Sequence, residues 1–113
     1  MSGDLDQALL KAAQNKQAVM LDIYADWCIT CKEMEKDTFS NPAVHEQLQN
    51  VLLLQADVTA NDAMDQALLE RFGIFGPPAI LFFVDGQERR NMRVIGYMQA
   101  GAFVQHIRAA TAL

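Results

Sequence analysis

Hydrophobic positions along the chain follow two periods, one typical of amphipathic helices and the other of buried strands. Apolar residues at helical spacing predict an opening helix from residue 4 to about residue 15. The almost continuously apolar residues 19–24 predict a central strand that is covered on both faces, and residues 51–57 predict another buried strand. The first half of the chain therefore begins with a helix and contains two core strands.

Helix-favouring residues and capping signals fill the spaces between these strands. Residues 31–39 favour a helix, and Asn41-Pro42 predicts a second helical segment that ends near residue 49, because Asn is a cap residue and Pro suits the first helical position. A further helix is predicted after residue 60, capped by Asn61 or Asp62 and ending before Gly73.

The last third of the chain predicts a hairpin and a closing helix. Residues 79–84 are apolar, Asp85-Gly86 is a turn dipeptide, and a second strand is predicted from about residue 92 to residue 97. The order, a βαβ half followed by a ββα half, predicts an α/β fold with a central mixed sheet of about four strands flanked by helices. No linker or repeat interrupts it, so we interpret residues 1–113 as one domain.

The composition and net charge argue against some classes of binding partner. The net charge of −5 and the pI near 4.8 argue against a nucleic-acid surface, because such a surface needs clustered Lys and Arg. Arg89, Arg90 and Arg93 do cluster, but they follow a turn, and we interpret them as solvating a hairpin.

The longest apolar runs are far shorter than the ~18 residues of a membrane helix. The first residues lack the features of a secretory signal, so we expect any export signal to lie outside this sequence.

Two cysteines, Cys28 and Cys31, lie where a buried strand passes into a helix. Residues three apart on a helix have Cβ atoms ~5–6 Å apart, so such a pair opens and closes a disulfide without refolding. We interpret Cys28 as the nucleophile, because the first helical turn favours a thiolate. Cys31 is directed toward the core and is expected to resolve a mixed disulfide. The pattern predicts thiol–disulfide exchange, which requires no cofactor.

Two other interpretations of these cysteines are weaker. A zinc site needs more ligands, but the chain has no second CxxC, and His45 and His106 lack a metal-binding spacing. Inert core thiols have no reason to lie together at a strand-to-helix turn. We therefore expect no metal site, and we place both histidines at the surface or rim of predicted helices.

Three more residues are candidates for the site. Pro78 precedes an apolar strand, at a turn where, from the residues alone, a trans bond is expected more often than a cis bond. Asp22 interrupts the central strand before Cys28, and Glu35 lies one helical turn after Cys31. Both carboxylates are candidates for modulating the cysteine pKa, and Asp22 is the stronger one because burying a carboxylate is costly. Glu35 is equally well explained as an exposed helix residue.

The sequence resembles the thioredoxin superfamily through Asp22-Ile23-Tyr24-Ala25-Asp26-Trp27-Cys28-x-x-Cys31-Lys32 and Gly76-Pro77-Pro78-Ala79. More specifically, it resembles the C-terminal periplasmic domain of the DsbD family of bacterial transmembrane thiol:disulfide interchange proteins. The strongest marker is Val58-Thr59-Ala60-Asn61-Asp62, because this stretch has no generic role in a thioredoxin. Ile29-Thr30 and Pro77 depart from the usual pattern, which leaves the redox potential and the partner groove open.

This resemblance implies a thioredoxin fold and an electron relay. The domain would take electrons from a membrane-embedded cysteine pair and pass them to a second, N-terminal periplasmic domain of the same full-length protein. The resemblance also implies that Pro78 is the family's cis-proline, that Trp27 and Pro78 contact partners, and that Asp22 and Glu35 are the acidic residues beside the active site. We expect a monomeric periplasmic domain. A free-standing protein-disulfide reductase and a non-catalytic binding module with this fold remain alternatives.

Overall fold

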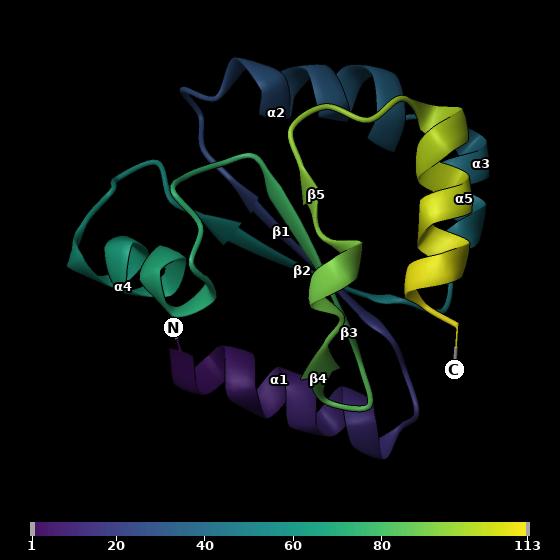
Figure 1. The fold of residues 1–113 in the computed structure, drawn as a ribbon, viewed down its shortest axis with the longest axis horizontal. Coiled ribbons are helices and arrows are strands. Elements are labelled where there is room, and N and C mark those ends of the chain that lie inside the picture. Colours follow the sequence, from purple (N-terminus) through teal and green to yellow (C-terminus); the bar gives the residue numbers. More distant parts are fainter. Residues whose placement is uncertain (1, 113) are drawn as a thin grey trace.

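A mixed five-stranded sheet lies between two groups of helices in the computed structural model, which describes residues 2–112 (Figure 1). The strands are β1 (Val19–Tyr24), β2 (Leu52–Asp57), β3 (Ala79–Val84), β4 (Gln87–Glu88) and β5 (Val94–Ile95). The helices are α1 (Ser2–Gln14), α2 (Ile29–Glu33), α3 (Pro42–Gln47), α4 (Ala63–Phe72) and α5 (Ala100–Ala110). A π-helical segment, Met34–Phe39, continues α2, and a 3-10 turn, Arg90–Met92, separates β4 from β5.

The order of the strands confirms one sequence prediction and corrects another. β1 is central, as predicted: it pairs in parallel with β2 and antiparallel with β3. The prediction that β2 is a buried strand is wrong, because β2 forms an edge of the sheet in the described chain and its Leu53 is 51% exposed. An edge strand has a neighbour on one side only, so an apolar sequence does not ensure its burial.

The predicted hairpin is present, but its second strand is shorter and earlier than expected. The turn residues Asp85 and Gly86 have φ values of 57° and 79°, the left-handed conformation that a tight two-residue hairpin turn requires. β4 follows this turn directly, and the 3-10 turn then interrupts the chain before β5. The strand predicted over residues 92–97 is present only as the two residues of β5, which pair antiparallel with Ile80 and Ala79 of β3, so its place is confirmed and its predicted length is wrong.

The arginine cluster does more than solvate this hairpin. Arg93 forms a two-pronged ion pair with Glu88 at 2.6 and 2.8 Å, and it also donates to the backbone carbonyl of Phe72 at 2.8 Å. Its pKa is raised by the hydrogen bonds to Glu88. Arg89 donates to the carbonyls of Ala109 and Ala110 at the end of α5. Both side chains therefore tie the hairpin to neighbouring helices, and the purely solvating interpretation is wrong for them.

Side chains of β1 and β3 alternate between two apolar cores. The core on the side of α1 and α4 includes Leu5, Leu9, Leu21, Ile23, Leu68, Leu81 and Phe83. The core on the side of α3 and α5 includes Met20, Met34, Val44, Ile80, Phe82, Phe103 and Ile107. Because all six residues of β3 are buried, this strand faces helices on both sides. Each fully buried large apolar side chain contributes roughly 1.5–3 kcal/mol before the opposing entropy is counted.

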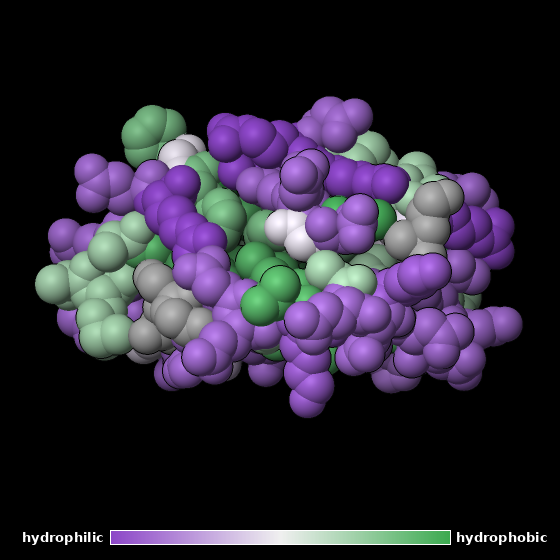
Figure 2. Space-filling view, turned by 90° about the horizontal axis from the view of Figure 1, so that it is seen from below, coloured by the Kyte–Doolittle hydropathy of each residue, from purple (hydrophilic) through white to green (hydrophobic). Residues whose placement is uncertain are grey.

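The opening helix α1 is amphipathic, as its spacing predicts. Leu5, Leu9 and Ala12 are buried, and the outward positions are mostly polar. Figure 2 views the molecule from the side on which α1 lies, and hydrophilic side chains cover most of that face. No helix within residues 2–112 is long and apolar enough to span a membrane.

The predicted helix ends are confirmed at three positions. Asn41 accepts the backbone N–H of Ala43 at 2.9 Å and caps α3. Asp62, one of the two predicted caps, caps α4, and Gly73 ends that helix at a φ of 66°. The helix predicted from residue 31 begins earlier, at Ile29, and the π-helical form of its second half has no signal in the sequence pattern.

Candidate redox site

Three chain segments meet at one edge of the sheet. Because β1 and β2 are parallel and β3 is antiparallel to β1, the C-terminal ends of β1 and β2 lie beside the N-terminal end of β3. The register pairs Tyr24 with Asp57 and Ile23 with Ala79. This edge therefore carries the loop that leads to Cys28, the turn after β2 and the peptide that precedes β3.

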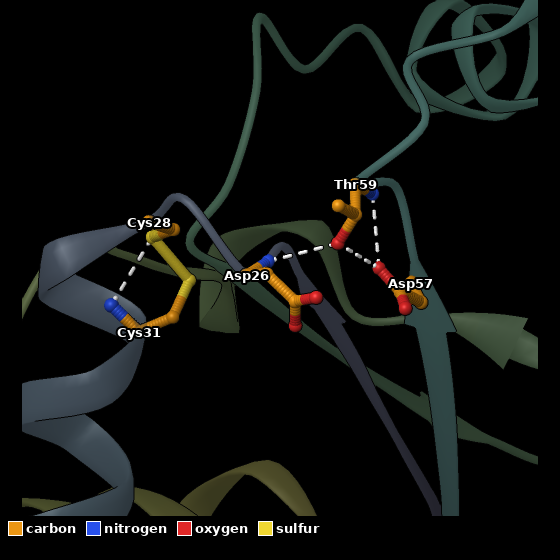
Figure 3. Close-up of a disulfide and its surroundings, with 5 residues drawn as sticks. All are labelled: Asp26, Cys28, Cys31, Asp57 and Thr59. Carbon is orange, nitrogen blue, oxygen red and sulfur yellow. Dashed lines mark hydrogen bonds between the residues drawn. A yellow bond between two sulfur atoms is a disulfide. The ribbon is translucent and has the colours of Figure 1, made fainter.

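Cys28 and Cys31 form a disulfide at the start of α2, with their Cα atoms 5.3 Å apart (Figure 3). Cys28 lies at the N-cap position, just before the first turn in which it was expected, and its Sγ accepts the backbone N–H of Cys31 at 3.1 Å. The residues are 6% and 5% exposed, so burial does not distinguish them. The N–H directed at Cys28 Sγ does distinguish them, because a donor stabilises negative charge on the sulfur that receives it.

The turn after β2 holds the loop that enters the disulfide (Figure 3). The hydroxyl of Thr59 accepts the backbone N–H of Asp26 at 2.8 Å, and the carbonyl of Thr59 accepts the indole N–H of Trp27 at 3.0 Å. Asp57 in turn accepts the backbone N–H of Thr59 at 2.9 Å and its hydroxyl hydrogen. These bonds lower the pKa of Asp57. In the sequence, Thr59 was notable only as part of the stretch that marks the family. No local pattern predicted its contacts with Asp26 and Trp27.

The peptide bond between Pro77 and Pro78 is cis. The residues alone favoured trans, and the family resemblance implied cis, so the structure agrees with the resemblance. Pro78 immediately precedes Ala79, which pairs with Ile23 near the end of β1. The proline therefore lies at the same edge of the sheet as the loop that leads to the cysteine pair.

The two candidate carboxylates line one groove. Asp22 and Glu35 both border a groove of about 510 Å³ between β1, β2 and the helices that follow the cysteines. Its apolar lining includes Met20, Phe39, Leu48, Leu53 and Leu54. Neither Cys28 nor Cys31 is among the described residues that line this groove. The structure thus brings Asp22 and Glu35 together, next to the redox segment on the α2 and α3 side of the sheet.

Asp22 is electrostatically perturbed in this groove. Burial is the larger cause and the nearby negative charge of Glu35 the smaller one, and together they raise the pKa of Asp22 from the ordinary value of 3.8 to about 6. When two carboxylates share a partly apolar groove, burial and the charge of its neighbour both disfavour the ionised form of the better buried carboxylate. A strongly perturbed acid in a groove next to the redox segment is a candidate functional group.

Three apolar side chains at or near the cysteine segment are exposed. Trp27 is 57% exposed, Ile29 is 75% exposed, and Phe75, which lies shortly before the cis-proline, is fully exposed. Exposed aromatic and aliphatic side chains of this size are typical of protein contact surfaces. Trp27 was predicted to lie at such a surface, whereas the exposure of Ile29 and Phe75 was not predicted. Their places in the sequence could have indicated that they belong to this surface: Ile29 follows Cys28 directly, and Phe75 lies two positions before Pro77.

The two histidines contact backbone carbonyls, and His45 also borders the groove that holds Asp22 and Glu35. His45 is exposed on α3, and its Nε2 contacts the carbonyl of Phe39. His106 is half-buried on α5, and its Nε2 lies 2.6 Å from the carbonyl of Met92. In the part of the chain that the structure describes, no group of three or more His, Cys, Asp or Glu side chains is arranged to hold a metal ion.

Comparison with known proteins is consistent with this geometry. A model of thioredoxin-like proteins matches residues 1–84. The thiol:disulfide interchange protein DsbD of Klebsiella pneumoniae is 53% identical over 93% of the chain, and that of Yersinia pestis is 54% identical over 95%. The chain spans only 17–18% of the length of these relatives. The oxidised C-terminal domain of Neisseria meningitidis DsbD matches with a TM-score of 0.83 and 34% identity, covering 97% of this chain and 96% of that one.

The chain therefore belongs to the thioredoxin-like family. The predicted thioredoxin fold, with a mixed sheet between helices, is confirmed. Within this family, the similarity is to the C-terminal domain of DsbD, which confirms the more specific resemblance stated from the sequence.

Proposed function

We propose that this domain relays electrons by thiol–disulfide exchange through Cys28 and Cys31. The observation that carries the proposal is the disulfide between them at the start of α2, in a chain that is 53–54% identical to DsbD proteins over nearly its whole length. A cysteine pair at this position is typical of proteins that reduce or oxidise other disulfides.

The reaction moves two electrons from this domain to a partner. In the reduced domain, the Cys28 thiolate attacks one sulfur of a partner disulfide, which forms a mixed disulfide and releases the first partner thiolate. Cys31, as a thiolate, then attacks the Sγ of Cys28, which forms the Cys28–Cys31 disulfide and releases the second partner thiolate. Both released thiolates take up protons, so the partner is reduced and this domain is oxidised.

The relay has a donor and an acceptor within one full-length protein. A membrane-embedded cysteine pair reduces this domain, and the domain then reduces an N-terminal periplasmic domain. The similarity to a DsbD C-terminal domain supports this direction and supports a periplasmic location. The surface that meets these partners includes Trp27 and Pro78, because both lie at the sheet edge that presents the disulfide.

Two measurements test the proposal. The reduced wild-type domain is expected to reduce the disulfides of insulin, and Cys28→Ser is expected to abolish this reaction. No insulin reduction by the reduced wild-type domain would instead indicate a binding module without redox catalysis, and reduction that persists in Cys28→Ser would show that Cys28 is not the reacting thiol. The reduced domain is also expected to react faster with the purified N-terminal domain of Klebsiella pneumoniae DsbD than with insulin. Equal rates would favour a free-standing reductase of broad specificity.

A further inference from the structure

Thr59 connects the turn after β2 to both residues that immediately precede the cysteine pair. Its hydroxyl oxygen accepts the N–H of Asp26, and its carbonyl oxygen accepts the indole N–H of Trp27. Asp26 and Trp27 come from the loop after β1, more than thirty positions earlier in the chain. Thr59 therefore restrains both residues that lead into Cys28, and Figure 3 shows its bond to Asp26.

The direction of these bonds is set by the chemistry of a hydroxyl group. A threonine hydroxyl has one hydrogen to donate and lone pairs that accept. The carboxylate of Asp57 takes the hydrogen, so the lone pairs of the oxygen are directed to the N–H of Asp26. Asp57 also accepts the backbone N–H of Thr59, which holds the turn itself in place. The result is a chain of bonds from the end of β2 to the residue two positions before Cys28.

We propose that Thr59 is a positioning residue for the redox reaction: its hydroxyl and carbonyl fix the Asp26–Trp27 loop and so set the orientation in which Cys28 meets a disulfide. This inference rests on the proposed exchange function and adds a residue outside the cysteine motif to it. Displacement of a sulfur requires a near-linear approach along the disulfide, so the rate depends strongly on how the attacking cysteine is held.

The position of the bonds separates this role from general stabilisation. The bonds of Thr59 to Asp26 and Trp27 lie at the exposed edge of the sheet, where water replaces a lost hydrogen bond at little cost in folding free energy. A loosened loop, in contrast, lowers the fraction of molecules in which Cys28 is correctly placed. We therefore expect changes at Thr59 to affect the exchange rate much more than the resistance to unfolding.

Matched substitutions test this role. Thr59→Val keeps the branched shape and removes the hydroxyl, whereas Thr59→Ser keeps the hydroxyl. Thr111→Val is the control, because it removes another threonine hydroxyl that donates to the carbonyl of Ile107 at the end of α5. The reduced proteins are reacted separately with insulin and with the small disulfide 5,5′-dithiobis(2-nitrobenzoate). Urea unfolding measures stability, and the emission of Trp27, the single tryptophan of the chain, reports on the loop.

Thr59→Val is expected to slow both reactions about tenfold, which corresponds to about 1.4 kcal/mol of activation free energy. Its Trp27 emission is expected to shift, and its urea midpoint to change little. Thr59→Ser is expected to keep the wild-type emission and a rate within about twofold of wild type, because its hydroxyl makes the same bonds. Thr111→Val is expected to match wild type in rate and emission.

Two results would overturn the proposal: wild-type rates in Thr59→Val, or a loss in Thr59→Ser as large as that in Thr59→Val. If Thr59→Val does not fold, Asp57→Ala removes the acceptor of the hydroxyl and leaves Thr59 in place. This variant is expected to react about threefold more slowly, and an unchanged rate would equally overturn the role. An inactive wild-type domain would refute the exchange function itself, so the two failures are distinguishable.

Discussion

Replacing Asp22 by Asn is expected to stabilise the folded domain at neutral pH. Burial is the main reason that the pKa of Asp22 rises from 3.8 to about 6, and the charge of Glu35 is the second. One pKa unit corresponds to about 1.4 kcal/mol, so holding Asp22 ionised in the folded state costs up to about 3 kcal/mol. Asn has nearly the same shape, carries no charge and avoids this cost.

Proton binding decides how the effect depends on pH. Between about pH 4 and pH 6, the folded state keeps a proton on Asp22 that the unfolded chain has released, so wild-type stability falls as the pH rises through this range. Below about pH 4, both states are protonated and the cost is absent; above about pH 6, it is complete. The stability advantage of Asp22→Asn is therefore expected to grow from about pH 4 to about pH 7 by up to about 3 kcal/mol.

Urea unfolding of the oxidised domain at several pH values, followed by Trp27 emission, measures this advantage. Glu35→Gln removes the second cause of the shift, so it is expected to give a smaller gain and to move the fall in stability to lower pH. Glu46→Gln removes an exposed carboxylate of α3 and serves as the reference for the loss of one negative charge. An advantage of Asp22→Asn that is constant with pH, or that grows as the pH falls, would refute the reasoning.

Three further predictions concern the cysteines and their partners. Asp22→Asn and Glu35→Gln are each expected to lower the thiol pKa of Cys28 and raise its alkylation rate at neutral pH, measured with iodoacetamide; a raised or unchanged thiol pKa in both would contradict this. Cys31→Ala is expected to accumulate a mixed disulfide with the partner on non-reducing gels, and Cys28→Ala is not; the reverse pattern would reassign the nucleophile. Pro78→Ala is expected to slow exchange with insulin more than with 5,5′-dithiobis(2-nitrobenzoate), whereas equal slowing of both would leave the proline a structural role only.

The part of the fold that follows from local chemistry was predictable from the sequence. The core strands β1 and β3 appear as apolar runs, broken in β1 only by Asp22, because a strand covered on both faces favours apolar side chains along its length. Asp62 and Gly73 mark the ends of α4 through capping chemistry that depends only on nearby residues. The cysteine pair was equally evident, since a spacing of three at a strand-to-helix turn brings the two sulfurs within bonding distance.

Features that depend on residues far apart in the sequence required the tertiary structure. Leu53 is apolar yet half exposed because the sheet order places β2 at an edge, and Arg93 is paired because the hairpin brings it to Glu88 and α4. The raised pKa of Asp22 comes from burial and from Glu35, which only the folded chain brings into the same groove. Thr59 and Asp26 are separated by 33 positions, so no local pattern links them. The sequence alone determines which residues are chemically able to react, and packing between distant segments decides how their charges and orientations are set.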